Sequence, residues 1–198
     1  MKRLAFLLLC LAMFAGCQNS SAPTEAPKPK PAELLTGRAA FQQLYVAARG
    51  WAPDTRPYQV QSGVLGTNNG RDGKAVIWNA SFGSASMHAS KPYSWSGIDS
   101  PDAPSRGVNP GTQDSFTPNN TFDIQFLKID TDKAFEEAQK HGGEKVLKDK
   151  PDTPVIYLLD WDSSNNKLVW HVIYGNSRNT AALVVDVDAT LGAFLRKE

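Results

Sequence analysis

Two stretches of the chain alternate large apolar side chains with smaller or polar ones at a period of two. They are residues 74–83 (KAVIWNASFG) and residues 167–175 (KLVWHVIYG). Because successive side chains of a β-strand point to opposite faces, this period predicts two strands that each pack one face on a core. Aligned on Trp78 and Trp170, the stretches also share a following aromatic residue and a glycine. The likeness suggests that a structural unit is repeated.

A helical pattern precedes each of these strands. Residues 33–49 and 130–141 place apolar side chains three or four positions apart, which predicts two amphipathic helices. Asp130 is a suitable N-cap for the second helix. Gly50 is expected to end the first helix and the glycine pair at 142–143 the second, since glycine is common just beyond a helix.

The spacing between helix and strand supports the duplication. An Ala-Phe pair recurs in the two helices and ends at Phe41 and Phe135. Phe41 lies 37 residues before Trp78, and Phe135 lies 35 residues before Trp170. We expect both tryptophans in the core, packed under these phenylalanines. We therefore predict an α+β fold of two tandem α-β-β-β units, each with a helix packed on a small antiparallel sheet.

The remaining apolar runs complete the units. Asparagine, aspartate and glycine cluster at 68–73 and 162–166, where we expect the turns that lead into the tryptophan strands. Residues 97–120 hold four prolines and three glycines, and they favour a flexible linker between the units over a binding loop. Further strands are predicted over residues 58–60, 86–96, 121–129, 155–161, 180–187 and 193–195.

The first sixteen residues form a targeting signal. Lys2 and Arg3 precede an apolar run over residues 4–16. A helix of these thirteen residues rises about 20 Å, which is shorter than the roughly 30 Å apolar layer of a bilayer. Residues 1–16 are therefore predicted to be a secretory signal and not a membrane-spanning helix.

The end of this signal, residues 14–17 (FAGC), resembles the bacterial lipobox. That resemblance implies that Cys17 becomes the lipid-modified first residue of the mature protein and joins it to a membrane. Phe14 departs from the usual pattern, in which an aliphatic residue is commoner, and the alternative is an ordinary secretory signal with an unrelated cysteine. Gln18 stands where an aspartate would favour the inner membrane, so the resemblance places the protein at the outer membrane of the cell envelope, facing the periplasm.

A tether is predicted after the cysteine. Residues 18–31 contain four prolines and no large apolar side chain, so they cannot form a core and stay extended. At about 3 Å per residue the tether would hold the folded part up to roughly 40 Å from the membrane. We divide the chain into a signal peptide (1–16), a lipidated cysteine with its tether (17–32), a first unit (33–96), a linker (97–120) and a second unit (121–198).

Cysteine usage and charge narrow the classes of function. Cys10 lies within the signal, so Cys17 is the only cysteine of the mature chain, and the folded part has no disulfide. Without residues 1–16 the chain has 19 basic residues (21 less Lys2 and Arg3) against 20 acidic ones. Such a balance, with no basic run, offers no electrostatic footprint for phosphate backbones, and we expect no nucleic-acid partner.

Side chains that carry chemistry are few and scattered. None of His88, His141 and His171 has a second histidine at the helical or short-loop spacing of a zinc site. Residues 160–166 resemble a calcium loop superficially, but the central glycine and the closing glutamate are absent. The sequence also lacks a Gly-x-Ser-x-Gly elbow and a phosphate-binding glycine loop. We expect no catalytic residue, no metal and no cofactor; a hydrolase or metal-dependent enzyme is the alternative.

Aromatic residues without a counterpart in the other unit are the candidates for recognition. They are Trp51, Tyr93, Trp95 and Trp161, near predicted turns or strand ends. Exposed on one face, they would form a rigid contact surface for a protein partner. The alternative is that they fill gaps between the two units.

The last strands of the second unit resemble the PepSY family, which includes propeptides of thermolysin-like metalloproteases and bacterial envelope proteins. The resemblance rests on the W-x-V of the tryptophan strand, at 170–172, and on the acidic strand end at 187–189 before a glycine turn. It covers about residues 131–196, with a weaker copy over 33–95. Thr190 lies one place earlier than in the family pattern, and the first copy lacks the turn.

The family resemblance implies protein binding, in some members the inhibition or chaperoning of an exported protease. We therefore predict a non-enzymatic protein-binding module of the periplasm or cell envelope, anchored to the membrane through lipid on Cys17, with an unknown protein as partner. The alternative is a structural lipoprotein that bridges outer-membrane or cell-wall components.

Overall fold

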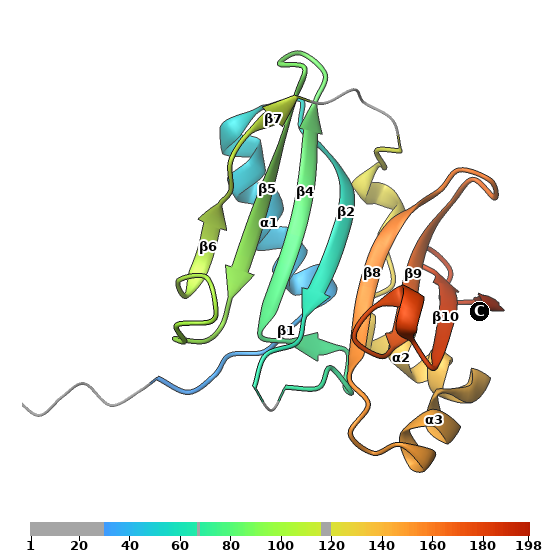
Figure 1. Cartoon of the computed structure of the whole chain (residues 1–198). Coiled ribbons are helices and arrows are strands. Elements are labelled where there is room, and N and C mark those ends of the chain that lie inside the picture. Colours follow the sequence, from blue (N-terminus) through green and yellow to red (C-terminus); the bar gives the residue numbers. More distant parts are fainter. Residues whose placement is uncertain (1–29, 67, 116–119) are drawn as a thin grey trace, which may run out of the picture.

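One antiparallel sheet of nine strands forms the centre of the molecule (Figure 1). The computed structural model describes residues 30–66, 68–115 and 120–198, so the predicted signal peptide, Cys17 and most of the tether lie outside the described residues. Eight strands follow the order β11-β10-β9-β8-β2-β4-β5-β6, and β7 pairs with β5. The strands are β2 (Arg56–Gly63), β4 (Ile77–Ser84), β5 (Ala89–Ser96), β6 (Gly107–Pro110), β7 (Asp114–Ser115), β8 (Val155–Asp162), β9 (Lys167–Tyr174), β10 (Leu183–Asp188) and β11 (Phe194–Lys197).

Helices cover one face of this sheet, and the α+β fold class is confirmed. Helix α1 packs on β2, β4 and β5, while α2 packs on β9 and β10. The side chains that both halves of the sheet turn toward these helices form one hydrophobic core. Outside the large sheet, β1 (Leu35–Thr36) pairs with β3 (Lys74–Ala75). The helical elements are α1 (Gly37–Trp51), η1 (Ile124–Phe126), α2 (Thr131–Ala138), η2 (Gln139–Gly143), α3 (Glu144–Asp149) and η3 (Arg178–Thr180).

The order of the strands repeats about the centre of the sheet. β8, β9, β10 and β11 follow one another outward on one side, and β2, β4, β5 and β6 do so on the other. At the centre β2 pairs antiparallel with β8, with Gln61 opposite Leu158. The sequence leaves open whether the two units pack together; the structure joins them in one continuous sheet, with β8–β11 on one side and β2, β4, β5, β6 and the short β7 on the other.

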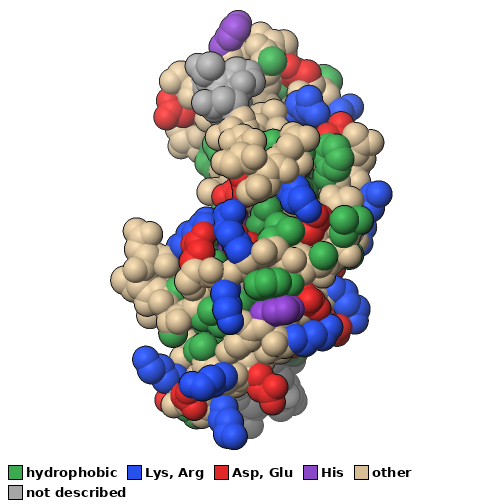
Figure 2. Space-filling model, turned by 90° about the vertical axis from the view of Figure 1, so that its right-hand side faces the viewer, with side chains coloured by type: hydrophobic (Ala, Val, Ile, Leu, Met, Phe, Trp, Pro, Cys, Tyr) green, Lys and Arg blue, Asp and Glu red, His purple; other side chains and the backbone are tan. Residues whose placement is uncertain are grey.

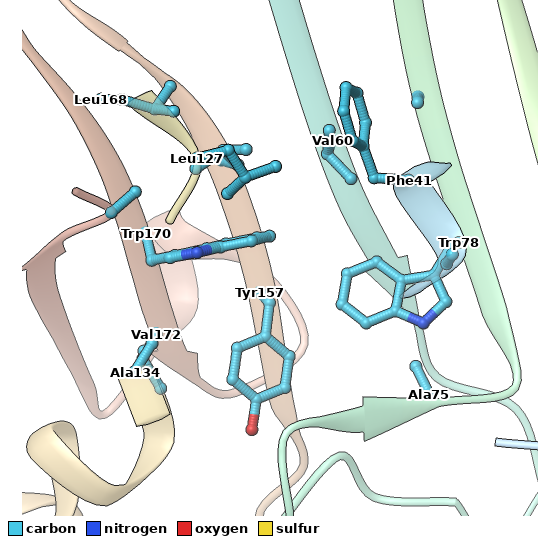
Figure 3. Packing of buried hydrophobic residues seen from close by; sticks show 14 of the residues in the cluster. Phe41, Val60, Ala75, Trp78, Leu127, Ala134, Tyr157, Leu168, Trp170 and Val172 are labelled. Atoms are coloured by element: carbon cyan, nitrogen blue, oxygen red, sulfur yellow. The ribbon is translucent and has the colours of Figure 1, made fainter. Parts of the chain in front are cut away.

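The two tryptophans occupy matching places in the core, as predicted. Trp78 and Trp170 are fully buried, and Figure 3 shows Tyr157 of β8 between them. The Trp78 indole Nε1–H donates to the carbonyl oxygen of Leu35 at 2.9 Å, and that of Trp170 donates to Ile129, also at 2.9 Å. Each acceptor lies two residues before the first residue of a helix. Each indole therefore ties its strand to the start of the helix that covers it.

The N-termini of α1 and α2 meet and share one cap. The Asp130 carboxylate accepts from the backbone N–H of Thr131 in α2 and of Arg38 in α1, at 2.7 and 2.9 Å. It also accepts from the Thr36 hydroxyl at 2.7 Å. A carboxylate at a helix N-terminus satisfies free N–H groups and opposes the positive end of the helix dipole. Asp130, predicted as the cap of one helix, thus serves both.

A glycine allows this close approach. The backbone N–H of Gly37 donates to the Thr131 hydroxyl at 2.8 Å. A Cβ at Gly37 would lie 2.7 Å from the Trp170 ring and 2.8 Å from the Thr131 methyl group. Only glycine fits here without displacing the tryptophan, because a carbon–carbon approach below about 3.4 Å is repulsive.

Two segments between β5 and α2 differ from the prediction. Residues 97–120, expected to be a flexible linker, contain β6 and β7, which both pair with β5 and extend the sheet. Residues 121–129, expected to be a strand, form the single turn η1. Asp123 is the physical reason, because its carboxylate accepts from Gln125 N at 3.0 Å and its carbonyl from Phe126 N at 3.1 Å, which closes a turn that a strand cannot contain.

The ends of the helices also differ. Gly50 lies inside α1, which continues to Trp51, and Ala52 N donates to Ala48 O beyond it. In the second half Gly142, at φ 115°, breaks the helical path as expected, but the chain turns through η2 and continues as α3. The predicted strands over 86–96, 180–187 and 193–195 are present as β5, β10 and β11, with shifted ends.

Candidate protein-binding groove

The four aromatic residues proposed for recognition do not share a surface. Tyr93 and Trp95 are buried in the core, on the face of β5 that α1 covers. Trp51 is half-buried, and its indole N–H donates to the Gln113 side chain at 2.9 Å. Trp161 is half-buried at the other half of the sheet. Two of the four therefore fill the core, and only Trp161 belongs to the site described below.

A groove runs between α1 and the turn η1. Its volume is about 500 Å³, within the usual range for a ligand-binding cleft. Arg38, Gln42 and Val46 follow one another at intervals of four along α1, so they form one stripe of the helix. The lining consists of Arg38, Phe41, Gln42, Tyr45, Val46, Ile124 and Leu127.

A second hollow, of about 250 Å³, lies on the other side of η1. Phe126 and Trp161 stand here with ring centroids 5.5 Å apart, beside the turn between β10 and β11. That turn contributes Leu191, which is 72% exposed. The lining consists of Phe126, Trp161, Asn166, Lys167, Leu168, Asp188, Thr190 and Leu191.

Exposed apolar side chains line both hollows. Val46 is 73% exposed on α1, and Ile124 and Phe126 project from η1 with 41% and 37% exposed. Together with Trp161 and Leu191 these side chains form what we call the apolar strip. It holds half of the exposed large hydrophobic residues of the described chain. Grouped apolar side chains on a surface are a feature of protein interaction sites, whereas single ones are ordinary.

One basic side chain, Arg38, borders the groove. The Arg38 guanidinium donates to the carbonyl oxygen of Lys128 at 3.0 Å. Within the described ranges, the ion pairs involve neither Arg38 nor Lys128. At the second hollow Lys167 is already paired with Asp188 at 2.8 Å. The guanidinium of Arg38 therefore offers a positive charge at the groove without an ion-pair partner among the described residues, and an acidic group of a partner would be favoured there.

The sequence carried a signal for two of the residues that the prediction missed. Val46 is apolar but falls outside the helical face of Phe41, Leu44 and Ala48, which is the buried one. Leu191 is a large apolar residue in a turn. No sequence pattern indicates that these two residues lie near η1, because that depends on how the two halves pack.

A cluster of polar side chains lies on the face of the sheet opposite to the helices. His171 of β9 is 2% exposed; its Nδ1 contacts Asp186 of β10, and its Nε2 lies 3.0 Å from Asp160 of β8. Arg196 of β11 lies 2.9 Å from the second oxygen of Asp186, an ion pair without good hydrogen-bond alignment. Both ring nitrogens of His171 therefore face carboxylates, which suits an imidazolium that ties three strands together.

The stability of the fold should depend on the charge of His171. Burial lowers the pKa of His171, but hydrogen bonds and charges from Asp160 and Asp186 raise it by more, so the net shift is upward. A raised folded-state pKa stabilises the fold below the ordinary pKa of about 6.5, and this contribution is lost as pH rises through the folded-state value. We expect the urea midpoint of the wild type to fall as the pH rises above about 6.5 and His171 loses its proton in the folded state.

The His171→Gln variant is the control for this pH dependence. Glutamine cannot take up a proton, so the variant should lose the part of the slope that His171 causes. The nearby charges of Arg178, Arg196, Asp162 and Glu198 are the same in both proteins. Equal slopes for the two proteins would contradict the assignment of the charge to His171.

The other histidines have structural surroundings. His141 stacks on the Phe194 ring with centroids 3.8 Å apart and lies 3.2 Å from the Glu137 carboxylate. His88 occupies the turn between β4 and β5 at φ 47°. Across the described ranges, no three His, Cys, Asp or Glu side chains are grouped as metal ligands, and no helix is long and apolar enough to span a membrane. The face on the side of β10 and β11 mixes charges of both signs with hydrophobic side chains (Figure 2).

Comparison with known proteins gives one structural match. No protein-family model matches the chain, and no curated protein matches it. The fold is similar to the crystal structure of a "putative lipoprotein" from Clostridium difficile 630, with a TM-score of 0.53 and 11% sequence identity. The match covers 80% of this chain and 91% of the other. At this identity the likeness shows a shared fold, and the PepSY resemblance continues to rest on its motif residues.

Proposed function

We propose that this protein is a non-enzymatic, lipid-anchored module of the cell envelope that binds a partner protein along the apolar strip. The observation that carries the proposal is the grouping of Val46, Ile124, Phe126, Trp161 and Leu191 around η1. The lipobox-like residues 14–17 and the prolines of the tether support the anchor. The similar fold of a protein named as a lipoprotein is consistent with it.

The partner segment that fits the site combines apolar and acidic groups. Apolar side chains would enter the groove beside Phe41 and Ile124, where burial from water is favourable. An acidic side chain would lie beside the charge of Arg38, which lines the groove. We therefore propose an amphipathic segment of an exported protein as the occupant, and the PepSY resemblance makes an exported protease the first partner to examine.

A photo-crosslinker can locate the partner on the strip. It is placed at Val46, which is 73% exposed, and for comparison at Met87, which is 45% exposed in the turn between β4 and β5. We expect an adduct with one envelope protein from Val46 and no such adduct from Met87. Adducts that are the same from both positions would overturn the proposal.

Affinity measurements with a synthetic peptide from the crosslinked segment then test the chemistry. Ile124→Asp puts a charge into the groove and should weaken binding about tenfold or more. Arg38→Glu should weaken it and also reduce its dependence on salt. Met87→Asp is the matched control and should change the affinity less than about twofold. An affinity that Ile124→Asp leaves unchanged would show that the partner binds elsewhere on the protein, and would contradict the proposal.

A further inference from the structure

The chain enters the fold through a segment that is held in place. The Arg106 side chain donates to the carbonyl oxygens of Lys30 and Pro31, at 3.3 and 3.0 Å. The backbone N–H of Glu33 donates to Gly97 O at 2.9 Å. Figure 1 shows this segment at the end of the sheet where β2 and β5 end and β4 begins. The predicted tether therefore joins the folded part at a defined place.

A largely aliphatic hollow, which we call the entry hollow, lies beside this segment. Its volume is about 580 Å³, and its apolar lining consists of Ala32, Leu34, Leu65, Val76 and Ile98. Leu34 is 40% exposed, and so is Val64, which directly precedes Leu65 in the chain. The rest of the lining is Gly66, Asn68, Asn69, Arg71 and Asp72. Apolar side chains grouped in this way on a surface indicate an interaction site.

The charges around the entry hollow are balanced. The lining itself has one charge of each sign, on Arg71 and Asp72. Lys74 lies 3.9 Å from Asp72, and Arg106, beside the entering chain, lies 2.9 Å from Asp99. Because neither sign is in excess, this surface favours a partner that is recognised by apolar contact and not by charge.

The place of the tether decides which apolar partner the hollow meets. The predicted tether joins Ala32 to Cys17, the predicted lipid site, so at about 3 Å per residue the hollow stays within roughly 40 Å of the membrane surface. A short linker makes a second contact intramolecular, with an effective concentration on the order of millimolar. Even a weak apolar contact with the membrane is then populated.

We propose that the protein docks on a lipid surface through the entry hollow, an inference that rests on the anchor at Cys17 in the proposed function. Leu34, Val64 and Ile98 enter the boundary between headgroups and acyl chains, where binding strength grows with the apolar area that is buried. The entry hollow shares no lining residue with the groove beside η1, so docking does not occupy that groove.

A photo-crosslinker at Ile98 tests the docking. Cys17 is the only cysteine of the predicted mature chain, so this chain is coupled through it to maleimide lipid in phosphatidylcholine vesicles. A crosslinker at Met87, which is 45% exposed in the turn between β4 and β5, is the reference. We expect about fivefold or more lipid adduct from Ile98 than from Met87.

The coupling separates this test from those of the proposed function. It supplies the anchor whether or not the cell attaches lipid to Cys17, and the mass of the protein from its native membrane reports that lipid directly. The crosslinker at Val46 reports the partner protein. A failure of the anchor, of partner binding or of docking is therefore recognised separately.

Leu34→Asp supplies the second arm. It puts a charge at the hollow while the tether stays the same, so the lipid adduct from Ile98 should fall to the level of Met87. Met87→Asp in the same protein is the matched control, since the two side chains are 40% and 45% exposed, and it should change the adduct less than about twofold.

Salt distinguishes apolar docking from attraction by charge. Between about 0.05 and about 0.5 M salt the lipid adduct from Ile98 should change less than about twofold, because screening acts on charges and not on apolar contacts. A loss of the adduct at high salt, equal adducts from Ile98 and Met87, or an adduct that Leu34→Asp leaves unchanged would each overturn the proposal. Crosslinks between two copies of the chain in place of lipid adducts would overturn it as well.

Discussion

Trp170→Ala should destabilise the protein by about 3–5 kcal/mol, the usual loss for a large aromatic side chain removed from a core. Trp170 is fully buried, and its indole N–H also holds the chain before α2 through Ile129 O. Its ring lies against Gly37 at the start of α1, so the cavity would open between the two halves of the molecule. Urea denaturation at neutral pH measures the change in the free energy of unfolding.

Trp78→Ala and Trp51→Ala serve as references for the loss of stability in Trp170→Ala. Trp78 is buried to the same degree and bonds to Leu35 O at the same distance, so its loss should be similar. Trp51 is half-buried at the end of α1, and its removal should cost about 1 kcal/mol. A loss below about 2 kcal/mol for Trp170→Ala would show that the core relaxes around the missing ring.

Asp130→Ala should cost about 2–4 kcal/mol, more than an ordinary helix cap. The carboxylate accepts from Thr131 N, Arg38 N and the Thr36 hydroxyl, and so closes the N-termini of two helices. Its removal leaves donors from both halves without a partner at the interface between them. Thermal and urea unfolding are the measurements, and the loss should appear in a single cooperative transition.

Asp132→Ala is the matched control for the shared cap. Asp132 lies in the first turn of the same helix, but among the described residues its side chain accepts only from its neighbour Lys133 N, at 2.7 Å on the surface. Its removal should cost less than about 1 kcal/mol. Asp130→Asn keeps an acceptor and should recover part of the stability. Equal losses for Asp130→Ala and Asp132→Ala would show that the cap across the two helices adds nothing.

The candidate site shows how far the sequence reaches. Trp161 was expected at a recognition surface and does line the second hollow, whereas Tyr93 and Trp95 proved to be core residues. The alternation of β5 was visible in the sequence. The sequence did not show that α1 covers the face of β5 from which Tyr93 and Trp95 project. The groove itself exists because residues 121–129 form η1 rather than a strand, a result of the Asp123 turn.

The sequence by itself determined the main local elements. Periods of two and of three to four gave the tryptophan strands, both long amphipathic segments and the buried state of Trp78 and Trp170, because these depend only on which side chains leave water. The repeat was visible in the sequence for the same reason. Two units that bury the same positions have similar residues at similar spacing. The predicted anchor at Cys17 also belongs to the sequence alone.

Tertiary structure decided how the two halves meet. Backbone hydrogen bonds form between strands of almost any sequence. The sequences of β2 and β8 therefore do not show that these two strands pair and make one sheet. The same holds for β6, which the proline-rich segment supplies to β5. The shared cap at Asp130 and the apolar strip around η1 both arise where distant segments come together, and only packing brings them into contact.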